Sequence, residues 1–250
     1  MVGGGRLGHA LTRALRDAGV AVSGPHGRGY DGRGDDLVLL CVPDAAIADA
    51  AAAIVPGPLV GHCSGATTLA PLAPHEALSL HPLMTVPTPD ADLRGAPCAI
   101  AGSSPRALAT AEALAAALEM RAVAVADEDR AAYHAAASIA ANYLQAVEGL
   151  ATRLAASAGV DRALLGPLVH AAVDAWQAEG APAALTGPVA RGDEQTVARQ
   201  RAAVAERLDP SDLALFDALT AATARLAGRL DPTVPTAAPA VDRIPTGSVA

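Results

Sequence analysis

The chain has 250 residues, a formal net charge of −8 and a hydrophobic fraction of 52%. This length allows one large core or two modest ones. The acidic balance argues against a nucleic-acid surface, no uninterrupted apolar stretch reaches the roughly 18 residues of a membrane span, and the start lacks a secretory signal. We therefore expect a cytoplasmic protein that binds neither nucleic acid nor membranes.

The lysine and cysteine content of the sequence limits the kinds of catalytic and metal sites that the protein can contain. The sequence contains no lysine, which excludes a lysine base or Schiff base. Its cysteines, Cys41, Cys63 and Cys98, are far apart and form no C-x-x-C pair. We therefore expect isolated thiols and no metal site.

A glycine turn of the form G-x-G-x-x-G opens the chain, with glycines at positions 3, 5 and 8. In dinucleotide-binding turns the first glycine permits the bend, the second lets the backbone approach a pyrophosphate, and the third lets helix and strand pack closely. Apolar periodicity predicts a helix over residues 6–18, whose N-terminal N–H groups favour anions. The expected cofactor contacts here are Gly3, Gly5, Arg6, Leu7 and Gly8.

Only Met1 and Val2 precede this turn, where a complete strand is normal. Two explanations stay open: the two residues form a stub that pairs with neighbouring strands, or the natural start lies upstream. Because the turn itself is intact, we expect the short strand to affect stability more than cofactor binding.

A short apolar segment over residues 20–23 predicts the second strand. The acidic residue that binds the ribose of NAD is expected about 20 residues after the glycines, and none stands there. His26 and Arg28 follow the segment instead and favour the 2′-phosphate of NADP. A solvated loop with incidental charges is the alternative for both residues.

Strands and helices then alternate up to residue 126. Pro43 ends the next strand, and Asp44 is placed to cap the helix that follows. This alternation predicts a doubly wound parallel sheet of Rossmann type in an α/β domain. The expected strands lie within 37–42, 58–66, 77–84, 97–103 and 121–126, and the expected helices are 45–54 and 105–119.

The second half shows helical periodicity only. The expected helices cover 128–157, 161–178, about 193–207 and 211–229. Trp176 is expected in their core. We predict a Rossmann NAD(P)-binding domain over 1–126, an all-α substrate and dimerisation domain over 127–229, and a flexible tail over 230–250.

Five segments carry a resemblance to a known family: CVPDAAI (41–47), HCSGA (62–66), LHPL (80–83), YHAAASIAANYL (133–144) and LTGPVARGD (185–193). Together they resemble Rossmann-like proteins with a C-terminal DUF2520 domain. These are similar to the 6-phosphogluconate and 3-hydroxyisobutyrate dehydrogenases, ketopantoate reductase and pyrroline-5-carboxylate reductase. The resemblance implies an NAD(P)-dependent oxidoreductase, a helical domain that supports homodimers and a substrate cleft between the domains. The resemblance does not identify the substrate.

Polar residues follow several expected strands. Ligands of open α/β sheets bind beyond the carboxyl ends of the strands, so we expect these residues to line one crevice. His81 is favoured as a catalytic and substrate-binding residue because the family has a His-Pro motif there. Hydrogen bonding at a strand end is the alternative for His62 and His81. The expected cofactor contacts at these ends are Val42, Pro43, His62 and Ser64.

His134, Ser138 and Asn142 are spaced four residues apart and so share one helix stripe. Related dehydrogenases place a catalytic lysine four residues before a cleft asparagine, and the resemblance puts Ser138 at that lysine position. We therefore expect His134 to donate the proton and Asn142 to orient the substrate. Alternatively, His134 and Asn142 satisfy each other or the backbone at a domain seam.

The segment 185–193 breaks the helical pattern and predicts a loop. Asp193 is placed to cap the next helix. Arg191 could clamp a substrate carboxylate bidentately, or the loop could merely reverse the chain.

Two functions fit these observations. The first is an NADP(H)-dependent oxidoreductase that reduces a small oxo acid or imine between the domains. The second is a catalytically weak or inactive dinucleotide-binding regulatory or scaffold protein. NAD(H) or a deazaflavin in place of NADP(H) is less favoured.

Overall fold

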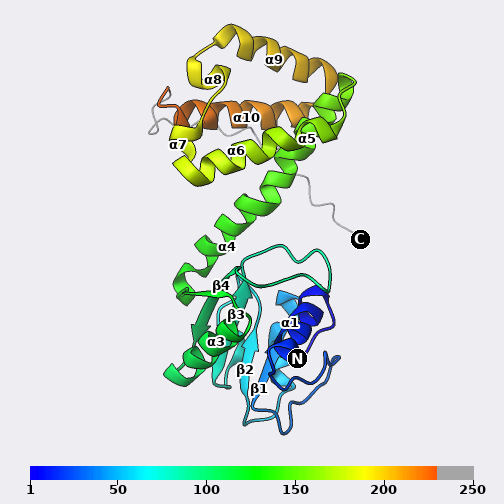
Figure 1. The fold of residues 1–250 in the computed structure, drawn as a ribbon, viewed down its shortest axis with the longest axis vertical. Coiled ribbons are helices and arrows are strands. Elements are labelled where there is room, and N and C mark those ends of the chain that lie inside the picture. Colours follow the sequence, from blue (N-terminus) through cyan, green and yellow to red (C-terminus); the bar gives the residue numbers. More distant parts are fainter. Residues whose placement is uncertain (230–250) are drawn as a thin grey trace, which may run out of the picture. The chain divides into compact units, whose positions relative to one another are not determined.

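The computed structural model describes residues 1–229. They form two compact units, Met1–Tyr143 and the residues from Leu144 onward. The first unit holds a mostly parallel sheet with helices, and the second is helical (Figure 1). This order confirms the predicted fold class. Residues 127–143, which the sequence pattern assigns to the second domain, group with the first unit, and the expected tail over 230–250 lies outside the described residues.

The sheet of the first unit has five strands in the order β1-β2-β3-β4-β5. All neighbouring pairs are parallel except β3 and β4, which are antiparallel, so the expectation of a wholly parallel sheet is wrong at that pair. Residues 83–96 between them contain no helix. Without a crossover helix the chain turns back along the same edge. The strands are β1 (Leu37–Leu40), β2 (Leu59–His62), β3 (Ala77–Pro82), β4 (Pro97–Gly102) and β5 (Arg121–Ala124).

Val2 extends this sheet beyond β1. It forms parallel bridges to Leu40 on one side and His26 on the other. Its N–H donates to Leu39 O at 2.9 Å, and Cys41 N–H donates to Val2 O at 2.7 Å. The two-residue stub therefore pairs with both neighbours, and the glycine turn begins at a reversal of strand order, where open α/β sheets bind ligands.

Residues 20–23 are not a strand, so this expectation is wrong. The Arg16 guanidinium donates to Val22 O at 3.0 Å and to Gly24 O at 2.9 Å. Because side-chain donors satisfy these carbonyls, the segment forms no ladder, and pairing with the stub occurs later, at His26.

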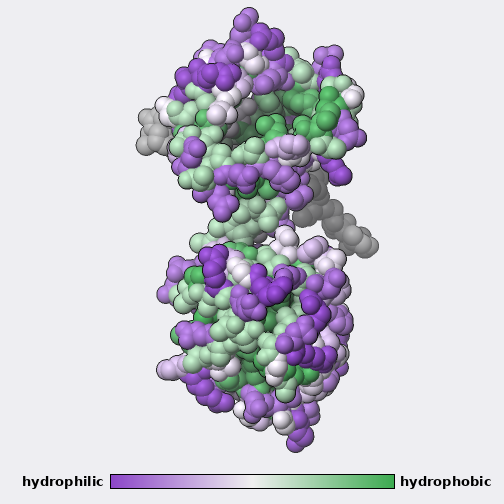
Figure 2. Space-filling view, viewed as in Figure 1, coloured by the Kyte–Doolittle hydropathy of each residue, from purple (hydrophilic) through white to green (hydrophobic). Residues whose placement is uncertain are grey.

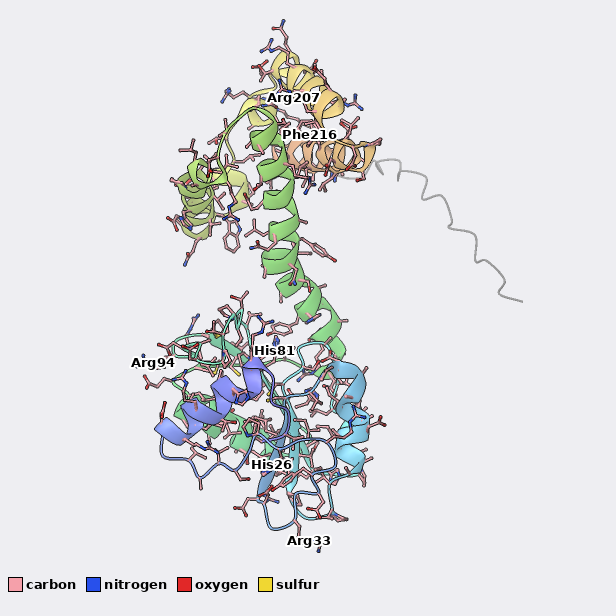
Figure 3. The ribbon with its side chains drawn as sticks, turned by 90° about the vertical axis from the view of Figure 1, so that its right-hand side faces the viewer. His26, Arg33, His81, Arg94, Arg207 and Phe216 are labelled. Carbon is pink, nitrogen blue, oxygen red and sulfur yellow. The ribbon has the colours of Figure 1, made fainter. Side chains whose placement is uncertain are left out.

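Helices cover both faces of the sheet (Figures 1 and 3). Leu39 and Ile100 face a core that includes α1 and α3, whereas Val38 and Leu40 face a second core that includes Ile47 of α2. This alternation of neighbouring β1 residues between two cores is the period-2 pattern of a buried strand. The helices are α1 (Arg6–Asp17), α2 (Ile47–Ala52) and α3 (Pro105–Ala117).

Asp44 does not cap α2, contrary to expectation. A short 3₁₀ turn, Asp44–Ala46, precedes the helix, and no side-chain cap bond is present. The Asp44 carboxylate instead accepts a hydrogen bond from Ser64 Oγ at 2.8 Å. The carboxyl ends of β1 and β2 are thereby connected.

The first unit ends with α4 (Arg130–Ser138) and a π-helical turn (Ile139–Tyr143). A π turn accommodates one extra residue and shifts the side chains that follow it relative to an uninterrupted α-helix. The single helix stripe predicted for His134, Ser138 and Asn142 is therefore interrupted before Asn142.

Within residues 144–229 the second unit consists of α-helices and one short 3₁₀ turn. Asp193 accepts from Thr196 N–H at 3.0 Å and so caps α9, as predicted. The expected loop over 185–193 contains the short helix α8, and Trp176 is 56% exposed in the single chain, so both of these expectations are wrong. The helices are α5 (Leu144–Ser157), α6 (Gly166–Glu179), α7 (Ala181–Ala184), α8 (Pro188–Arg191), α9 (Glu194–Arg207) and α10 (Pro210–Leu226). No helix within 1–229 has both the length and the hydropathy of a membrane span.

Gly8 is the position where α1 meets the sheet, and its substitution tests that contact. A Cβ there would lie 2.0 Å from Gly3 O and 3.3 Å from Cys41 Cβ. Because backbone cannot yield as a flexible side chain does, Gly8→Ala should lower the free energy of unfolding by about 1–3 kcal/mol in urea titrations.

Gly166→Ala is the matched control, since Gly166 lies in α6 with no atom within 4 Å of an added Cβ. This variant should be as stable as the wild type or slightly more so, because alanine favours helix. Equal stability of the Gly8→Ala variant would contradict the close packing at the turn.

Candidate functional site

The glycine turn has the steric features that a pyrophosphate site requires. A Cβ at Gly3 would lie 2.3 Å from Cys41 O, and one at Gly8 would lie 2.0 Å from Gly3 O, so both positions need glycine. An added Cβ at Gly5 would meet no atom within 4 Å. Gly5 is the N-cap of α1, and no side chain caps the helix there. The first turn of α1 therefore presents N–H groups to an open space, the arrangement that binds phosphate.

A pocket of about 500 Å³ lies on one side of this turn. Gly3 lines it together with four residues that the sequence predicts as cofactor contacts: His26, Arg28, Val42 and Pro43. The His26 ring stacks on Tyr30 with centroids 3.8 Å apart and planes 2° from parallel. Its Nε2 lies 3.0 Å from Ser23 Oγ. The loop thus presents an aromatic stack and a cation to the pocket.

A second pocket, of about 830 Å³, is lined entirely by residues of the first unit. All four residues predicted as catalytic line it. Its remaining lining is mostly apolar, with small side chains from α4 and the π turn and larger ones from the segment after β3. The predicted residues brought together here are His81, His134, Ser138 and Asn142.

Arg6 connects the turn with this second pocket. It is the first residue of α1 and also lines the 830 Å³ pocket, where its Nη1 donates to Pro87 O at 3.3 Å. The glycine turn therefore contributes Gly3 to one pocket and Arg6 to the other. A ligand with two ends joined by a pyrophosphate matches this arrangement.

His81 lies at the carboxyl end of β3 (Figure 3). Its Nδ1 is 2.8 Å from Tyr133 Oη, and its ring centroid is 6.5 Å from that of His134. Burial, together with the nearby charges of His134 and Arg130, lowers the pKa of His81 to about 4. His81 is therefore a neutral imidazole at physiological pH.

Gly65 lies close to the rings of both His81 and His134. A Cβ at Gly65 would lie 2.7 Å from His81 Cε1 and 2.9 Å from His134 Cδ2. The turn after β2 can approach the two rings only because this residue has no side chain.

His62 and Ser64 maintain that turn. Ser64 N–H donates to His62 Nδ1 at 3.2 Å, and His62 Nε2 lies 3.0 Å from Thr68 O, so both ring nitrogens have partners within the protein. Burial lowers the pKa of His62, which keeps the ring neutral. Ser64 Oγ bonds to Asp44 and to Thr67. This geometry matches the strand-end alternative for His62, and its contact with a cofactor stays a prediction.

Arg130 is a residue of this region that the sequence reasoning missed. Its side chain is 1% exposed, and it donates to Asp127 Oδ1 at 2.9 Å, to Ser64 O at 3.3 Å and to Ser79 Oγ. A buried cation is tolerated only when it is paired and hydrogen-bonded in this way. Arg130 thus connects α4 with the turn after β2 and with the middle of β3. An arginine after three acidic residues carries no local signal of burial.

Cys41 and Cys63 are not isolated, contrary to expectation. Their Sγ atoms are 3.5 Å apart, because β1 and β2 pair in register up to Leu40 and His62. The hydrogen bond with Cys41, together with burial, raises the pKa of Cys63, so that thiol stays protonated. Within residues 1–229 no cluster of histidine, cysteine or carboxylate side chains has the arrangement of a metal site.

Arg191 lies in α8 of the second unit. Its proposed role as a clamp for a substrate carboxylate concerns a site shared by both units and stays a prediction.

The neutral His81 should make stability depend on pH. Its folded pKa of about 4 lies below the roughly 6.5 of a free histidine. The unfolded chain therefore binds a proton that the folded chain lacks as the pH falls between these values. Acidification from about pH 7 to about pH 4 should reduce the free energy of unfolding, by at most about 3 kcal/mol from this group.

Urea titrations of His81→Gln at several pH values should show that this part of the pH dependence is gone. His170→Gln, exposed on α6, is the matched control and should keep the wild-type dependence. If the His81→Gln variant kept it as well, the assignment of a neutral, buried His81 would be wrong.

Comparison with known proteins defines the family and the fold. The family described as "Domain of unknown function (DUF2520)" matches residues 96–223, slightly more than half of the chain. No curated protein matches the chain in sequence.

Several solved structures share the fold. A protein from Bacteroides fragilis, described as a "putative NADP oxidoreductase", is 21% identical with a TM-score of 0.77 over 90% of this chain and 96% of that one. A Thermotoga maritima protein is 23% identical with a TM-score of 0.74 over 91% and 97%. A reductive aminase from Aspergillus terreus, in complex with NADPH and ethyl levulinate, is 18% identical with a TM-score of 0.67 over 91% and 96%. The family match runs from the start of β4 into α10, and the chain belongs to the DUF2520 family.

Proposed function

We propose that this protein is an NADP(H)-dependent oxidoreductase that reduces the C=O or C=N group of a small oxo acid or imine. One observation carries the proposal: the glycine turn lies at both a loop pocket with His26 and Arg28 and a larger pocket with all four predicted catalytic residues. A dinucleotide seated on the turn would place its adenosine end in the first pocket and its nicotinamide end at the second.

The residues of the turn fit this cofactor. The open space at Gly5 and the uncapped N-terminus of α1 would hold the pyrophosphate, and the close contacts at Gly3 and Gly8 keep the helix near enough to do so. A bound nicotinamide would supply the hydride of the reduction. The protein's own part is to bind the substrate, orient its polar group and provide the proton.

NADP(H) is favoured over NAD(H) by the loop pocket. Arg28 and His26 line it, and a guanidinium suits a phosphate monoester. Asp49 also lines the pocket, but from α2 rather than from the loop after the stub. Structural neighbours that bind NADPH, such as the Aspergillus terreus reductive aminase, support the same choice.

The larger pocket supports a small substrate with an anionic or polar end. Among its described lining residues Arg6 is the one permanent cation, and none is a carboxylate. The lining is otherwise apolar apart from His81, Tyr133, His134, Thr85, Ser138 and Asn142. An oxo acid would direct its carboxylate to Arg6 and its carbonyl to the histidines. The His134, Ser138 and Asn142 side chains, which line the same pocket, would orient that carbonyl.

As part of this proposal we expect a homodimer, because large apolar side chains are exposed on the helical unit. Leu164 and Leu168 are 70% and 68% exposed in the single chain, and Trp176 is also largely exposed. Figure 2 shows hydrophobic surface on the visible face of this unit. A second copy of the chain would cover such side chains. A cytoplasmic location remains a prediction from the sequence.

The absence of lysine favours one alternative, a dinucleotide-binding regulatory or scaffold protein with little or no catalysis. Related dehydrogenases use a lysine where this chain has Ser138. Binding without turnover would identify this alternative, and the absorbance of the purified protein would reveal a deazaflavin.

Arg28→Ala tests the choice of cofactor. If Arg28 pairs with the 2′-phosphate, calorimetry should show NADPH binding weakened by roughly 10- to 100-fold, the usual effect of losing a charged hydrogen bond. NADH binding should be unchanged. Arg33→Ala is the matched control, because Arg33 belongs to the same loop but pairs with Asp31 outside the pocket lining. Equal losses for NADPH and NADH would contradict recognition of the phosphate.

Turnover separates the enzyme from the scaffold. Oxidation of NADPH should be followed by absorbance with a panel of 2-oxo acids and cyclic imines. We expect at least one compound to be reduced, and we expect Gly5→Ala to abolish both NADPH binding and turnover while leaving the urea midpoint nearly unchanged. Tight NADPH binding with no reduction of any compound would favour the scaffold.

A further inference from the structure

Tyr133 belongs to the larger pocket, and no role was predicted for it from the sequence. It precedes His134 on α4 and lines the pocket. Its hydroxyl lies 2.8 Å from His81 Nδ1, and the two rings meet edge to face with centroids 5.6 Å apart. Tyr133 and His81 thus form a hydrogen-bonded dyad that connects α4 with the end of β3.

Neither member of this dyad is charged at neutral pH. Burial raises the pKa of Tyr133 above its usual range, and burial lowers the pKa of His81 to about 4. The pocket therefore contains a phenol and a neutral imidazole side by side. A phenol is a much stronger acid than a neutral imidazole, which carries a single N–H. Of the two groups, the phenol is the one suited to give up a proton.

We propose that Tyr133 is the proton donor of this pocket and that His81 is its positioning residue, with Nδ1–H donating to Tyr133 Oη. This inference rests on the proposed reductase function. With Nδ1 protonated, the phenol oxygen accepts from His81, and its own hydrogen is left for a ligand in the pocket. His134, which has no hydrogen-bond partner among the described residues, then contacts the substrate without supplying the proton.

The proposed reduction transfers one hydride and one proton to the substrate. The carbonyl or imine carbon accepts a hydride from the reduced nicotinamide, and its oxygen or nitrogen takes the proton as the Oη–H bond of Tyr133 breaks. The product is an alcohol or amine. The phenolate left behind accepts the Nδ1–H hydrogen bond of His81 and regains a proton from water.

The surroundings hold the dyad in this state. The Gly65 turn restricts the His81 ring, since a Cβ there would lie 2.7 Å from Cε1. The positive charge of buried Arg130 acts on both groups, disfavouring imidazolium at His81 and favouring phenolate at Tyr133. The titratable or charged groups that act on the dyad from the packed elements are Asp44, His62, Cys98, Arg130 and His134.

Nitrogen NMR of the histidine rings tests the proposal without any turnover. In the wild-type protein at neutral pH, His81 should be the Nδ1–H tautomer, and Tyr133→Phe should change its Nδ1 signal. Tyr143→Phe, an exposed tyrosine of the π turn outside the pocket lining, should leave that signal unchanged. An unprotonated Nδ1 that accepts from Tyr133 would overturn the proposal, because the phenol proton would then be committed to His81.

Kinetics with NADPH and the panel of 2-oxo acids and cyclic imines provides the second test. Tyr133→Phe should lower kcat by roughly 10²–10⁴-fold, the usual contribution of a general acid, with the NADPH affinity and the urea midpoint unchanged. Tyr143→Phe should retain wild-type kcat. Because a phenol acid keeps its proton, wild-type kcat should stay level from about pH 6 to about pH 9.

Two kinetic outcomes would overturn the assignment of Tyr133. One is a Tyr133→Phe variant that retains its kcat. The other is a kcat that falls as the pH rises through neutrality and is lost in His134→Gln, as an imidazolium acid requires. If the wild-type protein had no affinity for NADPH, the proposed function would be wrong. The role inferred for Tyr133 would then be wrong as well, whatever the tautomer of His81.

Discussion

The contact between α1 and the backbone of the preceding turn governs the arrangement of the N-terminal unit. Gly8 packs against Gly3 O, and Gly3 packs against Cys41 O, so the helix, the stub and the end of β1 meet without an intervening side chain. This approach brings the uncapped end of α1 to the point where strand order reverses. Both pockets include a residue of this region: Gly3 lines the smaller pocket, and Arg6 lines the larger one.

A buried arginine holds the start of α4, the helix that carries Tyr133 and His134, against the sheet. Removing a guanidinium from water costs several kcal/mol unless its donors are satisfied, and the donors of Arg130 bond to Asp127, Ser64 and Ser79. These bonds fix the start of α4 against the turn after β2 and the middle of β3. Tyr133 follows on the same helix and so reaches His81, while the charge of Arg130 disfavours protonation of the imidazole.

Together these two constraints shape the larger pocket of a chain that contains no lysine. α4 and the π turn contribute mostly small side chains to the lining of this pocket. Arg6 is the permanent cation among the described lining residues.

Features that depend on residues close in the chain were determined by the sequence itself. The glycine turn, α1, the five strands and the capping of α9 all follow from local periodicity, glycine spacing and capping residues, and the four predicted catalytic residues do line one pocket. Tertiary structure decided the rest: the reversal of β4, the pairing of the stub at His26, the Cys41–Cys63 contact, the burial of Arg130 and the Tyr133–His81 bond. Each of these joins segments remote in sequence, and its free energy depends on desolvation and register between elements, which no local pattern contains.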